Sequence, residues 1–250
     1  MARQGSDILA GRAVSTGSVY STILIATVIG RAAPDRRVER LVDVGSGDSP
    51  YRYVLDHDRY IGVDRRPRGS DALLVTGDAG ALPIADGVAD GVLCTEVIEH
   101  VPDERALAAE LARVAAPGAT LVLSAPFVHG LHEQPYDFRR LTSIGLVTVL
   151  QEAGWRVDSI SAVGGPIVVA VDGMVRWLDS LIRRVARRIG PCDSAPHRMI
   201  TAPSGFIQRR LAAIALARSR HIGPIDPMAP SPRLTLGYAV AATRKDGSAG

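Results

Sequence analysis

Two glycines separated by one serine follow an apolar run that carries an acid near its end. The acid is Asp43 and the loop is Gly45-Ser46-Gly47. Glycine lets the backbone turn tightly and lets a ligand approach it closely, where a side chain would block the way. The pattern is typical of a parallel strand that leads into a loop holding a nucleotide-like ligand. Because two glycines alone are a weak signal, the neighbouring charges must identify the ligand.

The charges around this loop favour a cationic ligand. Pro50 stands where a dinucleotide-binding motif has its third glycine, and Asp48 places a negative charge where a pyrophosphate would lie. Asp43 suits a ligand with a positive charge, and S-adenosyl-L-methionine carries an ammonium and a sulfonium. Asp64 follows Asp43 by 21 residues, about the spacing of a carboxylate that binds ribose hydroxyls. The sequence therefore predicts S-adenosyl-L-methionine rather than NAD.

Histidines and acids gather in the segment 124–142, which follows an apolar run. Transfer of a sulfonium methyl group to a hydroxyl needs in-line attack and a base that takes the proton. Histidine suits this role because its pKa lies near neutrality. We expect His129 or His132 to be the base, with His100 as the third candidate.

A divalent cation is a further expectation that the sequence leaves open. Nitrogen and oxygen donors cluster here, and the metal-ligand candidates are Glu99, His100, His132 and Glu133. An oxygen-rich site with a few histidines favours Mg or Mn over zinc, and such an ion could polarise the hydroxyls of a sugar. No linear spacing of these residues requires an ion.

Short apolar runs alternate with helical patterns along the chain. This alternation predicts a parallel sheet with helices on both faces and a ligand at the carboxyl ends of the strands. Strands are expected at 41–45, 59–63, 73–76, 88–94, 119–124, 155–162 and 234–243, and helices at 49–56, 103–115 and 142–153. Asp103 is the expected N-cap of the second helix.

Several of these segments resemble the class I S-adenosylmethionine-dependent methyltransferases, in particular the type 11 group. Each motif is weak alone, but their order and spacing are specific, and the resemblance covers about residues 38–160 and the last strand. The matching pieces are Val42-Asp43-Val44-Gly45-Ser46-Gly47, Gly62-Val63-Asp64, Gly77-Asp78-Ala79, Asp90-Gly91-Val92, Glu96-Val97-Ile98-Glu99-His100-Val101 and Pro117-Gly118-Ala119. The resemblance implies a Rossmann-like α/β fold, a seven-stranded and mostly parallel sheet with an antiparallel last strand.

The resemblance also implies roles for individual residues. Asp43 and the glycine loop would line the methionine end of the cofactor, Asp64 would hold the ribose, and Asp78 would accept from the adenine amino group. The full set of expected cofactor contacts is Asp43, Gly45, Ser46, Gly47, Asp64, Arg65, Asp78, Ala79, Thr95 and Glu96. Any one of these acids could instead cap a turn or helix. In the similar enzymes the segment around Asp137 looks architectural, so Asp137 is expected to pair with Arg139 or Arg140, and Thr142 to begin a helix.

The chain departs from the minimal fold at its N-terminal segment and again before its last strand. Residues 1–37 are expected to form a helical cover, in which the apolar stretch 19–30 is too short to span a bilayer. Residues 38–162 and 233–245 form the predicted cofactor-binding core. Residues 163–232 form a predicted helical insertion, which would be a lid, a dimer interface or both. Its arginine face is more often solvated surface than a binding site.

Composition is that of a globular enzyme. The chain of 250 residues is 46% hydrophobic and 22% charged, and its net charge of +3 is too small to indicate nucleic-acid binding. Cys94 and Cys192 lack metal-binding spacing, which favours a reduced, cytoplasmic setting.

The sequence thus predicts O-methylation of a small polar acceptor, a sugar or oligosaccharide, by a cytoplasmic enzyme, which would form a homodimer if the insertion is an interface. Two alternatives remain open at this stage. One is an N- or C-methyltransferase that acts on a natural product and needs no strong base for an amine. The other is a cofactor-binding but non-catalytic partner subunit, whose insertion would be the docking surface.

Overall fold

A computed structural model describes residues 19–66, 73–189, 206–215, 217, 223–226 and 234–246. The predictions for residues 1–18 and for Cys192 lie outside the described residues. So does much of the predicted insertion, including its proline-rich segments.

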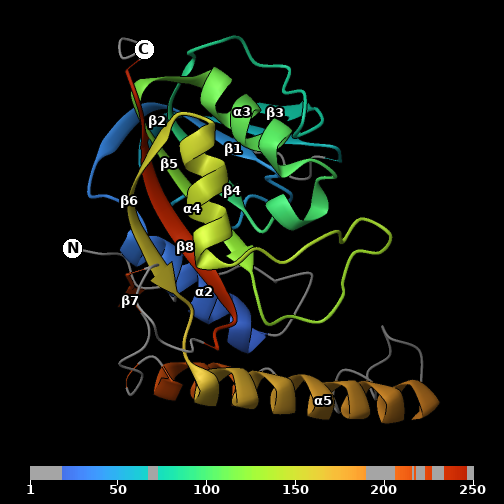
Figure 1. The fold of residues 1–250 in the computed structure, drawn as a ribbon. Coiled ribbons are helices and arrows are strands. Elements are labelled where there is room, and N and C mark those ends of the chain that lie inside the picture. The colour runs from blue at the N-terminus through green and yellow to red at the C-terminus, as the bar shows by residue number, and fades with distance from the viewer. Residues whose placement is uncertain are drawn as a thin grey trace.

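One twisted sheet forms the centre of the molecule (Figure 1). Its strand order is β3-β2-β1-β4-β5-β8-β6-β7. The strands are β1 (Arg37–Val44), β2 (Asp56–Asp64), β3 (Leu73–Thr76), β4 (Ala89–Thr95), β5 (Ala115–Pro126), β6 (Trp155–Ala162), β7 (Gly223–Pro224) and β8 (Gly237–Arg244). The first five run parallel, and β8 pairs antiparallel with both β5 and β6. The predicted seven-stranded sheet with an antiparallel last strand is confirmed, and β7 adds a two-residue strand at its edge.

Alternation along the central strands divides the core into two layers. On β5, Leu121 and Leu123 pack in one apolar cluster, while Val122 between them packs in the other. This is the period of two that places neighbouring side chains on opposite faces of a sheet. Both faces are covered, as expected for a mainly parallel sheet.

Helices α3 (Glu104–Val114) and α4 (Ser143–Glu152) cover one face (Figure 1). The carboxylate of Asp103 caps α3 by accepting from the amides of Arg105 and Ala106, at 2.9 and 3.0 Å. Thr142 caps α4, with its hydroxyl 3.1 Å from the amide of Gly145. Both predicted helix starts are therefore confirmed.

Helix α2 (Val19–Ala32) covers the other face, where Leu24, Val28 and Ile29 are fully buried. Helix α5 (Pro166–Ile189) continues from β6 and extends away from the sheet (Figure 1). Only part of α5 packs on the core, through residues such as Val168 and Val175. Residues 206–215, which lie within the predicted insertion, are also helical.

The helix expected at 49–56 is wrong. That segment consists of turns, and β2 already begins at Asp56. Gly47 and Ser49 have positive φ angles of 48° and 55°, which a right-handed helix does not allow. Tyr51, Val54 and Leu55 are nevertheless buried, so the segment packs as a loop.

Candidate active site

The carboxyl ends of β1, β2 and β3 lie side by side and carry the three acids predicted to bind the cofactor. Asp43 is level with Gly62 of β2, and Asp64 is level with Thr76 of β3. The amide of Gly77 donates to the carbonyl of Asp64 at 3.0 Å, and Asp78 follows directly. The acids therefore lie along one edge of the sheet, where open α/β sheets bind their ligands.

The glycine loop is tied closely to β2. The amides of Gly45 and Ser46 donate to the carbonyl of Val63, at 2.7 and 3.1 Å. Gly45 has a φ of +71°, and a Cβ atom there would lie 2.3 Å from a methyl group of Val97. Only glycine fits this position, because the backbone angle and the contact both exclude a side chain.

Asp43 is buried beneath the loop. One carboxylate oxygen accepts from the hydroxyl of Tyr60 at 2.6 Å. Burial raises the pKa of Asp43 to about 7, against the opposing effect of the Tyr60 hydrogen bond. The second oxygen of Asp43 and the hydroxyl of Ser46 are buried without a hydrogen-bond partner in the described part of the chain. Such unsatisfied polar atoms are costly, and the polar methionine end of S-adenosyl-L-methionine would give them partners.

Asp64 and Asp78 hold backbone amides. Asp64 accepts from the amides of Gly47 and Arg66, at 3.0 and 2.7 Å, and Asp78 accepts from Gly80 at 2.8 Å. Asp64 thus connects the glycine loop to the end of β2. The capping role that the sequence left open is present, and it is compatible with contacts to a nucleoside.

Thr95 and Glu96 lie where β4 ends. Glu96 has a φ of 56°, and its carboxylate accepts from the hydroxyl of Ser124 on β5 at 2.8 Å. Removal from water raises the pKa of Glu96. An acid in a left-handed conformation between two strand ends is a strained arrangement of the kind found at functional sites.

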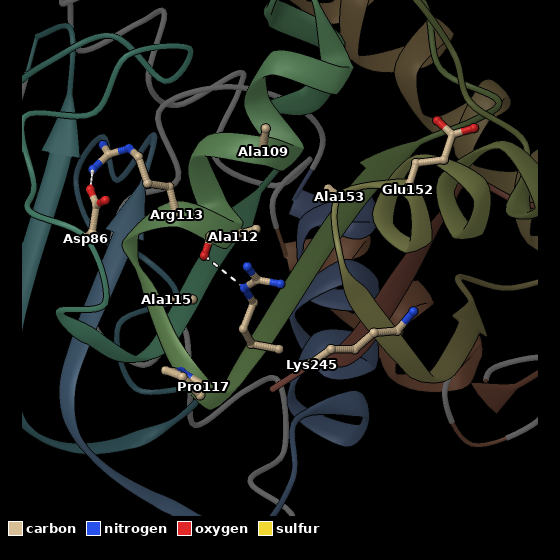
Figure 2. Close-up of a pocket in the computed structure, with 10 residues that line it drawn as sticks. Asp86, Ala109, Ala112, Arg113, Ala115, Pro117, Glu152, Ala153 and Lys245 are labelled. Atoms are coloured by element: carbon tan, nitrogen blue, oxygen red, sulfur yellow. Dashed lines mark hydrogen bonds and ion pairs between the residues drawn. The ribbon is translucent and has the colours of Figure 1, made fainter. Parts of the chain in front are cut away.

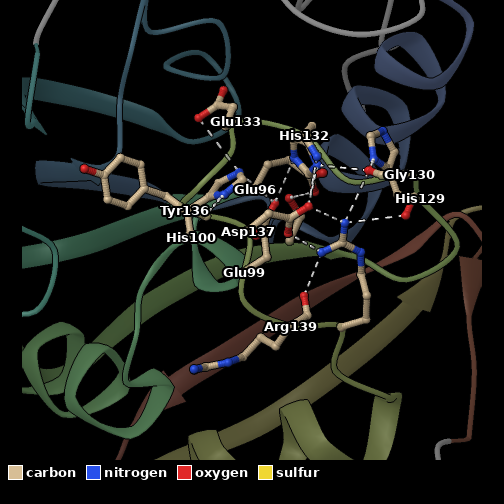
Figure 3. A network of polar contacts seen from close by, with 12 residues as sticks. Glu96, Glu99, His100, His129, Gly130, His132, Glu133, Tyr136, Asp137 and Arg139 are labelled. Atoms are coloured by element: carbon tan, nitrogen blue, oxygen red, sulfur yellow. Dashed lines mark hydrogen bonds and ion pairs between the residues drawn. The ribbon is translucent and has the colours of Figure 1, made fainter.

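The three predicted histidines form one cluster beside Glu99, as Figure 3 shows. The rings of His100 and His132 lie 4.7 Å apart, and those of His129 and His132 lie 4.6 Å apart. Glu99 and His100 come from the short helix η1 (Ile98–His100) after β4, whereas the other two histidines come from the loop after β5. The amide of Phe138 donates to the carbonyl of Glu99 at 2.8 Å and holds the loop in place.

Hydrogen bonds define which ring nitrogens are free. His100 Nδ1 lies 2.6 Å from the carbonyl of Tyr136, and His129 Nδ1 lies 2.8 Å from the carbonyl of Gly130. A carbonyl only accepts, so each Nδ1 carries a proton, and in the neutral ring Nε2 has a free lone pair. Burial lowers the pKa of His129 to about 4 and also lowers the pKa of His132, so both are neutral at neutral pH.

Asp137 organises this loop, as expected. Arg140 donates to both of its oxygens, at 2.5 and 2.9 Å, and this ion pair lowers the pKa of Asp137. Asp137 also accepts from the backbone amide of His132 at 2.9 Å. Arg139 instead pairs with Glu104. Of the two arginines that the sequence offered as partners, Arg140 is the one that binds Asp137.

Arg176 of α5 was not foreseen as a site residue. Its positive charge opposes the rise in the pKa of Glu96 and adds to the fall in the pKa of His129. The inserted helix therefore contributes to the electrostatics of the site. The insertion was expected to be helical, but no local signal showed that the charge of this arginine would act on Glu96 and His129.

A shallow pocket lies at the opposite edge of the sheet (Figure 2). It includes Ala115 at the start of β5 and Lys245 just after β8. Its arginines are engaged, because Arg113 pairs with Asp86 and Arg244 donates to the carbonyl of Ala112 at 3.0 Å. This pocket is remote from the predicted cofactor residues.

Comparison with known proteins agrees with the fold. The family model described as "Methyltransferase domain" matches residues 42–123. An uncharacterized methyltransferase of Mycobacterium leprae is 38% identical over 96 residues, which cover 34% of this chain and 36% of that protein. The chain thus matches about a third of the length of this curated relative.

Solved structures share the fold at low identity. A methyltransferase dependent on S-adenosylmethionine from Mesorhizobium loti aligns over 88% of this chain and 98% of its own, with a TM-score of 0.53 and 13% identity. The cyclase SpnF aligns over 90% of this chain and 80% of its own, with a TM-score of 0.53 and 19% identity.

Residues 42–123 therefore match a methyltransferase domain, and the chain shares its Rossmann-like fold with a solved S-adenosylmethionine-dependent methyltransferase. Among the described residues, no helix is both long enough and apolar enough to cross a membrane.

Proposed function

We propose that this chain transfers the methyl group of S-adenosyl-L-methionine to a hydroxyl of a small polar acceptor, a sugar or oligosaccharide. The observation that carries the proposal is the shared edge. The glycine loop and its acids end β1 to β3, and the cluster of His100, His129 and His132 follows β4 and β5 at the same edge. A donor site next to imidazoles that can accept a proton is what O-methylation requires.

His129 is the proposed base. When bound, the cofactor supplies an electrophilic methyl group on a sulfonium centre. His129 is neutral and its Nδ1 proton is held by the carbonyl of Gly130, so its Nε2 lone pair can accept the acceptor's hydroxyl proton. His129 also lies apart from Glu99, which His100 and His132 both face.

The first experiment separates cofactor binding from catalysis. Calorimetry with S-adenosylhomocysteine tests the cofactor site, and we expect Asp64→Ala to lose binding. A panel of sugar, lipid and polyketide acceptors with labelled methyl donor then tests transfer. Binding without transfer to any acceptor class would favour the non-catalytic alternative. Failure to bind S-adenosylhomocysteine would reject the proposal.

The second experiment tests the type of acceptor atom. With a hydroxyl acceptor, His129→Ala should lower kcat by about 10²- to 10⁴-fold, the usual effect of removing a general base. His57→Ala is the matched control, because His57 is half-buried and bonded to a carbonyl through Nδ1 but lies on β2. A kcat within a few-fold of wild type for His129→Ala would favour an amine or carbon acceptor.

The inserted helix α5 is a proposed lid or dimer interface. The electrostatic effect of Arg176 on Glu96 and His129 supports a position beside the acceptor. Large apolar residues that face solvent support an interface. They are Met174, Trp177, Leu178, Leu181 and Val185.

A further inference from the structure

The side chain of Glu99 is in an unusual position for a carboxylate. It is 1% exposed, and neither of its oxygens has a hydrogen-bond partner in the described part of the chain. Burying a charged group without partners costs roughly several kcal/mol, unless an opposite charge compensates the buried charge. A cation or a proton must therefore neutralise the carboxylate of Glu99.

Arg140 is a cationic candidate, but its two terminal nitrogens are occupied, and its Nε is itself buried without a hydrogen-bond partner in the described part of the chain. Its terminal nitrogens donate to Asp137 and to the carbonyls of Arg139, Gly130 and His129. It influences Glu99 only through its field and donates no hydrogen bond to it. Glu99 therefore still lacks a direct partner.

Two imidazole nitrogens face the same oxygen of Glu99. His100 Nε2 lies 3.6 Å from it and His132 Nε2 lies 3.8 Å from it (Figure 3). His100 carries its proton on Nδ1, which donates to Tyr136. His132 Nδ1 lies 3.3 Å from both Asp137 and the carbonyl of Gly130. In the neutral rings both Nε2 atoms therefore present lone pairs beside an oxygen of Glu99 that has no hydrogen-bond partner in the described part of the chain.

The spacing is too long for a shared proton and suits an ion. Hydrogen bonds between such atoms span roughly 2.7–3.2 Å. Two ligands each about 2.1 Å from one ion lie about 3.4 Å apart at a tetrahedral angle. The three donor atoms of Glu99, His100 and His132 all lie within 4.8 Å of one another.

The surrounding contacts match those of metal-binding histidines. Such histidines donate their other nitrogen to a carboxylate or a carbonyl, which fixes the ring. Asp137 and the carbonyl of Gly130 face His132 in this way, and the carbonyl of Tyr136 does so for His100. Glu133, the fourth predicted ligand, is exposed and its carboxylate lies 4.0 Å from His100. The structure thus brings three of the four predicted ligands together.

We propose that Glu99, His100 and His132 bind one divalent transition-metal ion, such as Zn²⁺, Fe²⁺ or Co²⁺, rather than Mg²⁺. Two imidazoles and one carboxylate suit these borderline ions, whereas Mg²⁺ prefers a shell of oxygens. Three protein ligands leave coordination positions for solvent or for an acceptor oxygen. This last role alone rests on the proposed function, because the binding of the ion does not depend on methyl transfer.

The test uses the untagged full chain after treatment with EDTA and exchange into metal-free buffer. Titration with Co²⁺, followed by calorimetry and by visible absorption, should show one ion per chain. Glu99→Gln and His132→Ala should each weaken Co²⁺ binding by at least about 100-fold, and Asp137→Asn by about 10- to 100-fold. Glu133→Gln and His57→Ala should bind Co²⁺ as wild type does.

Several outcomes would overturn the proposal. These are no Co²⁺ or Zn²⁺ binding by the wild type, binding that survives both Glu99→Gln and His132→Ala, or displacement of Co²⁺ by Mg²⁺. Circular dichroism and S-adenosylhomocysteine binding check that each variant folds. If Glu99→Gln does not fold, the partly exposed His132→Ala and His100→Ala variants decide. Failure of the wild type to bind Co²⁺ or Zn²⁺, with its S-adenosylhomocysteine binding intact, rejects the metal site alone. Metal binding by a wild type that binds no S-adenosylhomocysteine rejects the proposed function alone.

Discussion

Asp43, at the sheet edge where the cofactor is proposed to bind, makes the stability of the fold depend on pH because its pKa is raised. Its folded pKa of about 7 lies above the unfolded value of about 3.9, so folding favours the protonated form. This contribution is fully present below about pH 4 and is lost as pH rises through 7. Three units correspond to about 4 kcal/mol, as an order of magnitude.

We therefore expect Asp43→Asn to flatten the dependence of stability on pH. Asparagine cannot ionise, and its amide oxygen can still accept from Tyr60. Urea unfolding of the ligand-free protein at pH 5, 6, 7 and 8 would measure this. The free energy of unfolding of wild type should fall relative to the variant across that range. Parallel curves for the two proteins would show that Asp43 is already ionised in the folded state.

Gly45 offers a second test at a single residue. Gly45→Ala should lower affinity for S-adenosylhomocysteine at least about tenfold and also reduce stability, because the new Cβ would collide with Val97 and the φ angle is unfavourable. Gly87→Ala is the matched control, with a φ of +64° but open space around the Cβ position. The control should lose stability from strain alone and keep its affinity. Equal affinities for both variants would contradict a cofactor role for this loop.

At the level of elements, α5 exposes large apolar side chains that a second subunit could cover. Trp177 is 62% exposed and Met174 is 54% exposed, which is unusual for large apolar side chains on one helix. We expect the wild type to be a dimer in light scattering and the double variant Trp177→Ser, Leu181→Ser to be a monomer. Arg187→Ser, on another face of α5, should leave the dimer intact. A monomeric wild type would reject the proposal that α5 is a dimer interface, and the proposal that α5 is a lid would remain.

Sequence patterns located most strands because each strand is a local apolar run. Strand β1 nevertheless begins at Arg37, before the predicted residue 41, because its polar first half pairs with the exposed start of β2. The prediction of a helix at 49–56 was wrong because the loop imposes positive φ angles on Gly47 and Ser49. Local periodicity does not contain this information.

The site was predictable in its residue types but not in its contacts. His100 and His132 were separate candidates, 32 positions apart in the chain. Their approach to Glu99 depends on the docking of the loop after β5 through Phe138 and on the Arg140–Asp137 pair. The link between Asp43 and Tyr60 and the field of Arg176 are likewise products of tertiary packing.

At the level of the whole molecule, the place of β8 governs how the sheet can be completed. Gly237–Arg244 lies between β5 and β6 and supplies the backbone partners of both. During synthesis on the ribosome, β5 and β6 therefore leave the exit tunnel well before the strand that joins them. Until it arrives, two apolar edges remain open to pairing with other nascent chains. Chaperone dependence should consequently end only when β8 has left the exit tunnel and paired with β5 and β6.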